Sequence, residues 1–258
     1  MSFAISIQSE VLKTKRSASF WLSIMAAGFM PTILFLALYF KPNGAIAHLE
    51  HEPWKVFFNW GWSALSFFIF PMFVILICTL IPQIEYKNNT WKQVFASPQS
   101  LASIFFSKFL TIHFMLFFFY LLFTLFMILS GVISNLLNDK FSFLHHSIDW
   151  QNMAYLSFKT YISILGISAI QYWLSLRFKN FIAPVGIGLA LLICAFLARR
   201  VGWEYIYELP FAHPLLTAES FEQKNRPFLE NHELNSILYF VSFLAIGFLD
   251  LKFRKEKG

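Results

Sequence analysis

Two short polar segments combine imidazole and carboxylate side chains and are the first places where this sequence could do chemistry. The first contains His48, Glu50, His51 and Glu52, and the second contains His145, His146 and Asp149. Both groups are suitable zinc ligands, but a zinc site needs three or four of them in a tetrahedral arrangement. Adjacent histidines without further positioned ligands are typical of ordinary loops, so we expect no metal site and no cofactor in this chain.

Motifs with a known catalytic mechanism are absent from the sequence. It contains no G-x-x-x-x-G-K-[ST] phosphate loop, no G-x-S-x-G nucleophile elbow, no H-E-x-x-H and no C-x-x-C. The chain therefore cannot hydrolyse ATP alone by the phosphate-loop route, and we expect no catalytic residues and no enzyme activity. Its two cysteines, Cys78 and Cys194, lie inside apolar runs, where they behave as small hydrophobic side chains.

A few polar residues interrupt otherwise apolar runs: Thr111, His113, Lys159, Gln171 and Asp250. Ionisable groups at such positions are functional candidates in a membrane protein. Lys159 and Asp250, however, lie within a turn or two of the ends of their runs, where a side chain can snorkel to the interface, so we favour structural roles. Because no charged residue lies at the centre of a run, a carrier driven by protons or ions is disfavoured.

The composition indicates the environment of these residues. The chain has 258 residues, of which 57% are apolar and 13% are charged, whereas soluble domains carry roughly a quarter charged residues. Runs long enough to cross a hydrocarbon core of roughly 30 Å as helices occupy residues 20–40, 60–81, 109–133, 155–176, 181–198 and 236–251. We therefore predict an all-α integral membrane protein with six transmembrane helices, because hydropathy this continuous is typical of helices and not of barrel strands.

The distribution of basic residues predicts the orientation of these spans. With six spans both termini lie on one side, and the segments on that side contain twelve lysines and arginines but four acidic residues. The opposite side contains seven basic and ten acidic residues. By the positive-inside rule, both termini are predicted to be cytoplasmic.

The first 19 residues have a helical pattern of their own. Phe3, Ile7 and Val11 recur at steps of four, and the charged residues fall mostly on other faces. Residues 1–19 therefore predict an amphipathic helix that lies on the inner leaflet. A frayed basic terminus that merely orients the first span is the alternative.

The most informative segment is the predicted cytoplasmic loop 83–106. One apolar stripe of a surface helix is predicted by the spacing of Ile84, Trp91, Val94 and Phe95. Ser97 is expected to cap a second helix that begins at Pro98 and leads through Lys108 into the third span. Large apolar side chains on a charged segment are typical of a protein interface, and contact of the same stripe with lipid headgroups is the alternative.

This loop resembles the permease subunits of type-2 ABC exporters, including the lantibiotic-immunity kind. In that family a Glu ends the second span, a Thr–apolar–Lys step follows, and a Pro opens the helix that leads to a Lys before the third span. The positions that look like these are Glu85, Thr90, Trp91, Lys92, Pro98 and Lys108. The family usually has a Gly before the Thr and an Arg after the Pro, where this chain has Asn89 and no arginine.

The resemblance implies a single transmembrane permease domain over residues 1–258, with short re-entrant helices in the extracellular loop 199–235. It also implies that the loop 83–106 forms a coupling helix on a separate ABC ATPase subunit, which binds in two copies and holds the ATP and Mg. The ATPase-coupling residues would then be Glu85, Thr90, Trp91, Lys92, Phe95, Pro98 and Lys108. Two permeases, identical or related, would make one transporter.

The implied function is export of a hydrophobic or amphipathic substrate, a peptide or a lipid-like compound, across a bacterial inner membrane. Membrane lipids are expected partners and nucleic acids are not. Two alternatives stay open: an intramembrane enzyme that uses His113, His145 or His213, and an assembly or sensor protein without transport activity. The sequence shows no convergent polar groups at motif spacing that would favour the enzyme.

Overall fold

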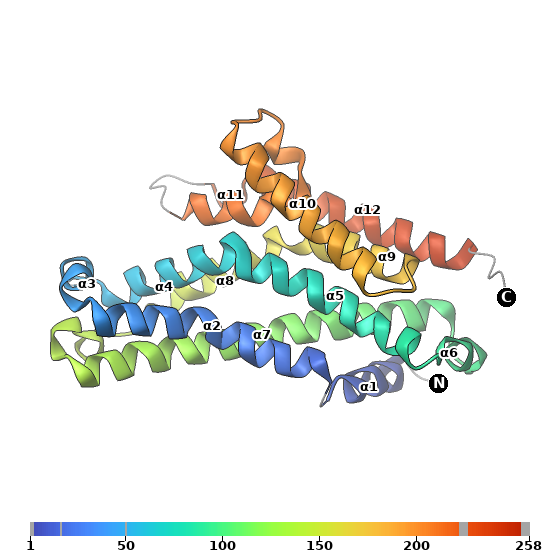
Figure 1. The fold of residues 1–258 in the computed structure, drawn as a ribbon, viewed down its shortest axis with the longest axis horizontal. Coiled ribbons are helices and arrows are strands. Elements are labelled where there is room, and N and C mark those ends of the chain that lie inside the picture. Colours follow the sequence, from blue (N-terminus) through green and yellow to red (C-terminus); the bar gives the residue numbers. More distant parts are fainter. Residues whose placement is uncertain (1–2, 16, 50, 222–226, 254–258) are drawn as a thin grey trace.

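The computed structural model describes residues 3–15, 17–49, 51–221 and 227–253, and every regular element within these ranges is helical (Figure 1). The predicted all-α class is therefore confirmed. Five helical stretches are long and apolar enough to cross a membrane, and a sixth span consists of two helices joined by a 40° bend. The predicted number of six spans holds when the bent pair is taken as one span.

The spans differ in length from the apolar runs that predicted them. They are α2 (Ala18–Phe40), the continuous stretch α4 (Pro53–Ala64), η1 (Leu65–Ile69) and α5 (Phe70–Lys87), then α7 (Leu101–Leu137), the bent pair α8 (Trp150–Ser163) and α9 (Leu165–Arg177), α10 (Ile182–Arg200) and α12 (Asn231–Phe253). The second and third spans exceed the predicted ranges 60–81 and 109–133, because the helices continue through the polar residues that bound each apolar run.

A π-helical turn, η1, interrupts the second span directly before Pro71. Proline has no backbone N–H, so Pro71 cannot donate to the carbonyl of Phe67, and a wider turn accommodates the missing bond. The hydroxyls of Ser66 and Thr160 share a buried hydrogen bond of 3.0 Å, which ties this turn to α8. Pro71 lies in the first turn of α5, as expected for a proline that starts a helix.

At the break between α8 and α9, a side chain from α12 forms hydrogen bonds with the freed backbone groups. The hydroxyl of Ser236 accepts a hydrogen bond from the Gly166 amide at 3.0 Å and lies 2.8 Å from the Ile162 carbonyl oxygen, to which it donates. Within a membrane, backbone groups released at a break need such partners, because no water is present to bind them. The bend of the fourth span and the position of α12 are therefore linked.

Short helices gather at the two ends of the long ones. One end, which we call the α6 end, contains α1 (Phe3–Thr14), α6 (Trp91–Ala96) and the end of α12 (Figure 1). The other, the α3 end, contains α3 (Pro42–Leu49) and the 3-10 turns η2 (Asp139–Phe141) and η3 (Phe143–His145). The segment 199–235 contains η4 (Ile206–Glu208), η5 (Pro210–Ala212) and the mostly buried α11 (His213–Ser220).

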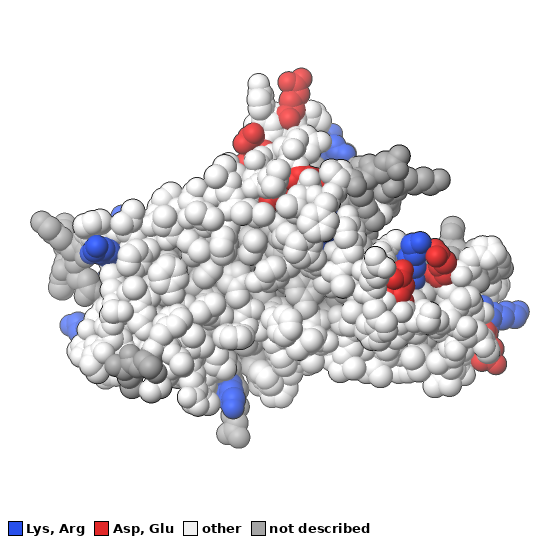
Figure 2. Space-filling model, turned by 180° about the vertical axis from the view of Figure 1, so that it is seen from behind, with Lys and Arg blue, Asp and Glu red and all other residues white. Residues whose placement is uncertain are grey.

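Aromatic side chains build the core between the second and third spans. Phe73 stacks on Phe119 with ring centroids 4.4 Å apart, and Trp62 meets Phe123 edge to face at 4.8 Å. On the face seen in Figure 2, charged side chains are sparse across the middle and gather toward the edges. A wide uncharged belt of this kind is what lipid chains require.

Candidate functional site

Four charged side chains from three helices meet at the α6 end, and we call them the four-charge cluster: Glu10 and Lys13 of α1, Glu85 of α5 and Lys108 of α7. Lys108 Nζ lies 2.6 Å from Glu85 Oε1 and 2.7 Å from Glu10 Oε2. Lys13 Nζ lies 2.6 Å from Glu10 Oε1 and 2.9 Å from Glu85 Oε1. Each cation therefore bridges both carboxylates, and the cluster carries no net charge.

The four charges differ in burial, and burial determines how strongly each depends on its partners. The side chains of Glu85 and Lys108 are each 1% exposed, whereas that of Lys13 is 36% exposed. Glu85 Oε2 has no hydrogen-bond partner among the described residues. Removing one member of a buried ion pair leaves an uncompensated charge, so Lys108 and Glu85 depend on each other more than either depends on Lys13.

The pKa of Glu10 reports the balance of these effects. Burial alone would raise the pKa of this carboxyl, but Lys108 and Lys13 together hold it below its ordinary value of 4.5. Burial would likewise lower the pKa of the Lys13 ammonium, but Glu10 and Glu85 raise it above 10.5. Both groups are therefore charged at neutral pH.

Helix α1 brings its polar face to the bundle and turns its apolar face outward. Ser6, Glu10 and Thr14 are buried, while Phe3 and Leu12 are about half exposed. The Ser6 hydroxyl donates to Gln99 Oε1 at 3.0 Å and accepts from the Ser103 hydroxyl at 3.1 Å. This arrangement suits a helix with protein on one side and lipid on the other. That residues 1–19 form a helix on the inner leaflet stays a prediction.

The predicted single surface helix over residues 84–95 is wrong, because the chain turns within it. Helix α5 runs to Lys87, and α6 begins at Trp91. Asn89, between them, has a φ of +53°, a left-handed conformation that asparagine tolerates better than most residues. Ile84 and Trp91 therefore lie on different helices. The Thr90 amide donates to the Glu85 carbonyl at 3.0 Å and closes the turn directly behind the buried carboxylate.

The side chain of Trp91, the first residue of α6, contacts the four-charge cluster. Lys108 Nζ is 5.4 Å from the centre of its ring, a cation–π contact, and the rings of Tyr86 and Phe95 lie 5.2 and 5.3 Å away. Trp91 and Phe95 are half-buried, whereas Lys92, a further predicted coupling residue, is exposed. The outer face of α6 thus carries the polar residues Lys92 and Gln93 beside the small Ala96, and its aromatic residues are more buried.

The predicted helix start at Pro98 is also wrong. Helix α7 begins at Leu101, and its cap is Ser100, whose hydroxyl accepts from the Ser103 amide at 3.1 Å. Ser97 instead donates back to the Val94 carbonyl and ends α6, and Pro98 lies exposed in the connection. Ser100 rather than Ser97 therefore supplies the cap. From Ser100 one continuous helix carries Lys108 into the membrane.

Two side chains near the end of α5 fasten it to the end of α9. Tyr86 Oη donates to the Leu176 carbonyl at 2.9 Å, and Gln83 Nε2 donates to the Phe178 carbonyl at 3.1 Å. Arg177, in the last turn of α9, forms an ion pair of 3.1 Å with Asp250 of α12. Both side chains are partly exposed, which agrees with the prediction that Asp250 lies near the interface. The spans at the α6 end are therefore linked through side chains rather than through apolar packing alone.

A second buried ionic group contradicts the prediction that Lys159 snorkels. Its side chain is fully buried and forms an ion pair with Glu233 of α12, and Nζ also donates to the Phe228 carbonyl at 3.2 Å. The reason is depth: Lys159 lies nine residues into α8, about 14 Å along the axis, where α12 covers it.

Histidines of the same region extend this pair, and we call the whole the Lys159 cluster: Lys159, Glu233, His232, Thr217 and His213. His232 Nε2 lies 2.8 Å from Thr217 Oγ1 of α11, and His213 Nε2 lies 3.0 Å from the Tyr207 carbonyl oxygen. Burial lowers the pKa of His213 to about 4, although that carbonyl opposes the shift, so the ring is neutral at pH 7. Sequence reasoning identified Lys159 but missed Glu233 and His232.

The remaining predicted polar candidates have structural partners. Gln171 Nε2 donates to the Pro184 carbonyl at 2.7 Å and to Thr79 Oγ1 at 3.1 Å, and so joins three spans. His113 Nδ1 lies 2.6 Å from Tyr161 Oη, and Thr111 donates back to the Ser107 carbonyl. The bonds of Gln171 and His113 join neighbouring spans, whereas that of Thr111 stays within its own helix.

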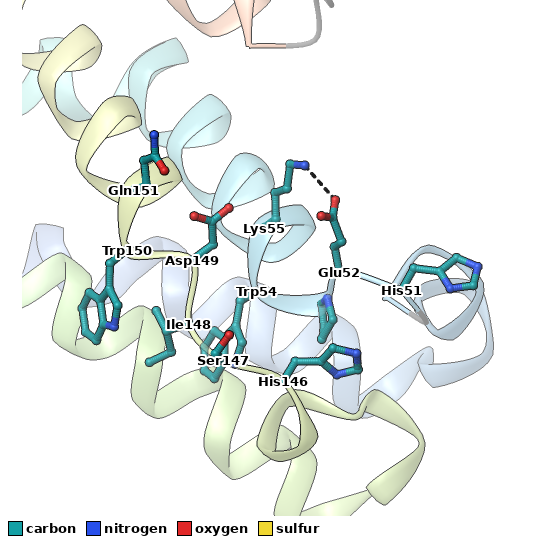
Figure 3. A pocket seen from close by; sticks show the side chains of 11 residues that line it. His51, Glu52, Trp54, Lys55, His146, Ser147, Ile148, Asp149, Trp150 and Gln151 are labelled. Carbon is teal, nitrogen blue, oxygen red and sulfur yellow. Dashed lines mark hydrogen bonds and ion pairs between the residues drawn. The ribbon is translucent and has the colours of Figure 1, made fainter.

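The two histidine-containing segments meet at one pocket (Figure 3). His51 and Glu52 precede α4, His146 and Asp149 precede α8, and together they line an open pocket of about 520 Å³. Glu52 is paired with Lys55 at 2.7 Å. Among the described residues, no three histidine, cysteine or acidic side chains lie close enough to hold a metal ion.

A family model described as ABC-2 family transporter protein matches residues 6–195 of this chain. The matched range runs from α1 into α10 and contains α6 and all members of the four-charge cluster. No curated protein matches the chain.

Proposed function

Because the chain belongs to the ABC-2 transporter family of multi-pass membrane proteins, we propose that it is the permease subunit of an exporter driven by a separate ATPase. ATP and Mg would be held by that partner, since this sequence has no phosphate loop. The observation that carries the proposal is the position of α6, a short helix with a polar outer face between two spans that share a buried ion pair.

In this proposal α6 is the coupling helix. The partner contacts its outer face at Lys92 and Gln93, and movement of α6 reaches α5 through the short turn at Asn89 and α7 through Trp91, which lies over Lys108. The Glu85–Lys108 pair makes α5 and α7 respond together, because separating two buried charges is costly. Glu10 adds α1 to the same unit.

The finer features of the proposal follow the family and the charge distribution. Two copies of the permease, identical or related, bind two ATPase subunits in a bacterial inner membrane, with the α6 end in the cytoplasm. The cargo is hydrophobic or amphipathic, a peptide or lipid-like compound. Exposed aromatic rings of Phe67 and Phe68, which stack on or near Phe196 of α10, offer a surface for such a cargo.

A pull-down of the tagged chain from native membranes in mild detergent, followed by mass spectrometry, tests the partner. We expect a stoichiometric ATPase with a phosphate-loop motif. Lys92→Glu should remove it, and Trp91→Ala with Phe95→Ala should weaken it, because α6 then loses its support. Equal thermal stability of Lys92→Glu and the wild type would show that the loss is not due to unfolding.

Lys179→Glu is the matched control, because Lys179 is also exposed and lies at the same end, in the connection between α9 and α10. This variant should retain the ATPase. If Lys92→Glu and Lys179→Glu retain equal amounts, α6 is not the docking helix. If no ATPase accompanies the wild type in several detergents, the permease assignment itself fails and an assembly or sensor role gains weight.

A further inference from the structure

A small cavity lies between the ends of α2 and α7 at the α3 end, far from α6. Its volume is about 170 Å³, several times the roughly 30 Å³ that a water molecule occupies. The wall is mostly apolar and includes Phe35, Leu38 and Leu137, with Ser134 and Asn138 as polar members. The cavity can therefore hold a segment of an amphipathic molecule but not the whole of one.

Ser134 offers a hydrogen bond inside this cavity. Its side chain is buried, and its hydroxyl has no partner among the described residues. Hydroxyls elsewhere on α7 find one: Ser107 and Thr111 donate back to carbonyls of their own helix, and Ser130 donates to the Pro31 carbonyl of α2. A buried hydroxyl without a protein partner indicates that another molecule satisfies it.

Two lysines are next in sequence to residues that line the cavity. Lys41 directly precedes Pro42, and Lys140 directly precedes Phe141, and both of these neighbours line the cavity. Both lysine side chains are exposed, and neither ammonium has an ion-pair partner within the part of the chain that the structure describes. The nearby acid Asp139 lies 3.5 Å from the Asn135 side-chain amide.

The depth of these groups matches the layers of a lipid. Ser134 lies three residues before the end of α7, about 5 Å inside it, whereas Lys41 and Lys140 lie just beyond the ends of the two spans. Lysines at the ends of spans reach the headgroup layer, where phosphates lie. A hydroxyl about one turn deeper lies near the level of the ester groups.

We propose that this cavity binds an anionic phospholipid of the leaflet at the α3 end. Lys41 and Lys140 hold its phosphate, and the Ser134 hydroxyl donates to an ester carbonyl. One acyl chain begins in the cavity and continues along the exposed apolar side of α7, past Ile133 and Leu129. The lipid thereby fills the groove between two spans that no described protein segment fills.

Native mass spectrometry of the full chain, with phosphatidylglycerol and phosphatidylcholine of identical chains, tests this site. We expect a preference of roughly tenfold or more for phosphatidylglycerol, since each lysine near an anionic headgroup contributes roughly fivefold in affinity. Lys41→Gln with Lys140→Gln should reduce the preference to about equal binding of the two lipids. Ser134→Leu, which fills the cavity, should lower the binding of both.

Lys55→Gln is the matched control, because Lys55 is exposed in the same half of the molecule but already paired with Glu52. It should keep the full preference. Equal binding of both lipids by the wild type, or an unchanged preference in the double variant, would overturn the proposal. Displacement of the lipid by glycerol phosphate without chains would assign the lysines to a free phosphate ligand instead. None of these measurements requires the ATPase, so they stand apart from the proposed transport function.

Discussion

The four-charge cluster and the Lys159 cluster are both buried, but they are built for different purposes. The first joins α1, α5 and α7 through two cations and two carboxylates, and one of its cations reaches water. The second is a single fully enclosed ion pair between α8 and α12, next to a hydrogen bond between His232 and Thr217. Loss of one cation leaves the first cluster partly compensated, whereas the isolated pair has no substitute partner.

The largest effect should follow from breaking the isolated pair. Lys159→Met leaves Glu233 buried without a cation, so we expect a loss of about 3–5 kcal/mol in the free energy of unfolding. Denaturant titration in detergent, followed by tryptophan fluorescence, measures it. Adding Glu233→Leu should recover most of the loss, because an apolar pair of similar volume replaces the ionic one. A double variant as unstable as Lys159→Met would show that the pair is not the cause.

Removing Lys108 should cost less stability but more function. Lys108→Met leaves Glu10 and Glu85 with Lys13, so we expect a loss of about 2–3 kcal/mol. Stimulation of the partner ATPase by the permease should fall far more than binding of the partner does. A double-mutant cycle with Glu85→Gln should give a coupling of about 1–3 kcal/mol. Additive effects would mean that α5 and α7 do not act through this contact.

The attachment of α1 to the bundle should depend on pH, because Glu10 and Lys13 hold it there as charged groups. Because the pKa of Glu10 lies below 4.5 in the folded state, its contribution is complete above that value and is lost as pH falls through the lowered pKa. The pKa of Lys13 is raised above 10.5, so its contribution is complete below that value and is lost at still higher pH. A spin label at Leu12 should therefore become mobile only at the two extremes. Glu10→Gln should remove the acid transition, and an acid transition unchanged in that variant would assign it to another group.

The smallest effect should come from Lys13. Its side chain is partly exposed, and Lys108 still bridges both carboxylates after Lys13→Ala, so we expect less than about 1 kcal/mol in the same unfolding measurement. High salt should reduce the difference further. A loss as large as that of Lys108→Met would contradict the division between a replaceable and an essential cation.

The membrane class and most of the spans follow directly from the sequence, because few structures other than transmembrane helices contain continuous apolar runs of this length. The boundaries do not, because helix α7 continues through Lys108, a residue that hydropathy treats as loop. The same reason explains the Lys159 error. Lys159 lies close to the end of the apolar run but far from the end of its helix, because α8 starts five residues before that run.

The four-charge cluster was half predicted. The loop pattern predicts Glu85 and Lys108, whereas the helical pattern of residues 1–19 predicts Glu10 and Lys13 only as part of the polar face of a helix on lipid. One signal was available: Glu10 and Lys13 are three residues apart and so lie on one helix face, and acidic residues are scarce on that side of the membrane. What no pattern in one sequence reveals is which face of α1 meets the protein, since that depends on contacts with α7.

The unbroken length of α7 has a mechanical consequence. Its 37 residues contain no proline and span about 55 Å, with Lys108 near one end and Ser134 near the other. A rigid rod of that length is a lever: a tilt of about 5° at one end displaces the other by roughly 5 Å. A modest push beneath the membrane would therefore arrive at the opposite surface as a displacement of about one helical turn.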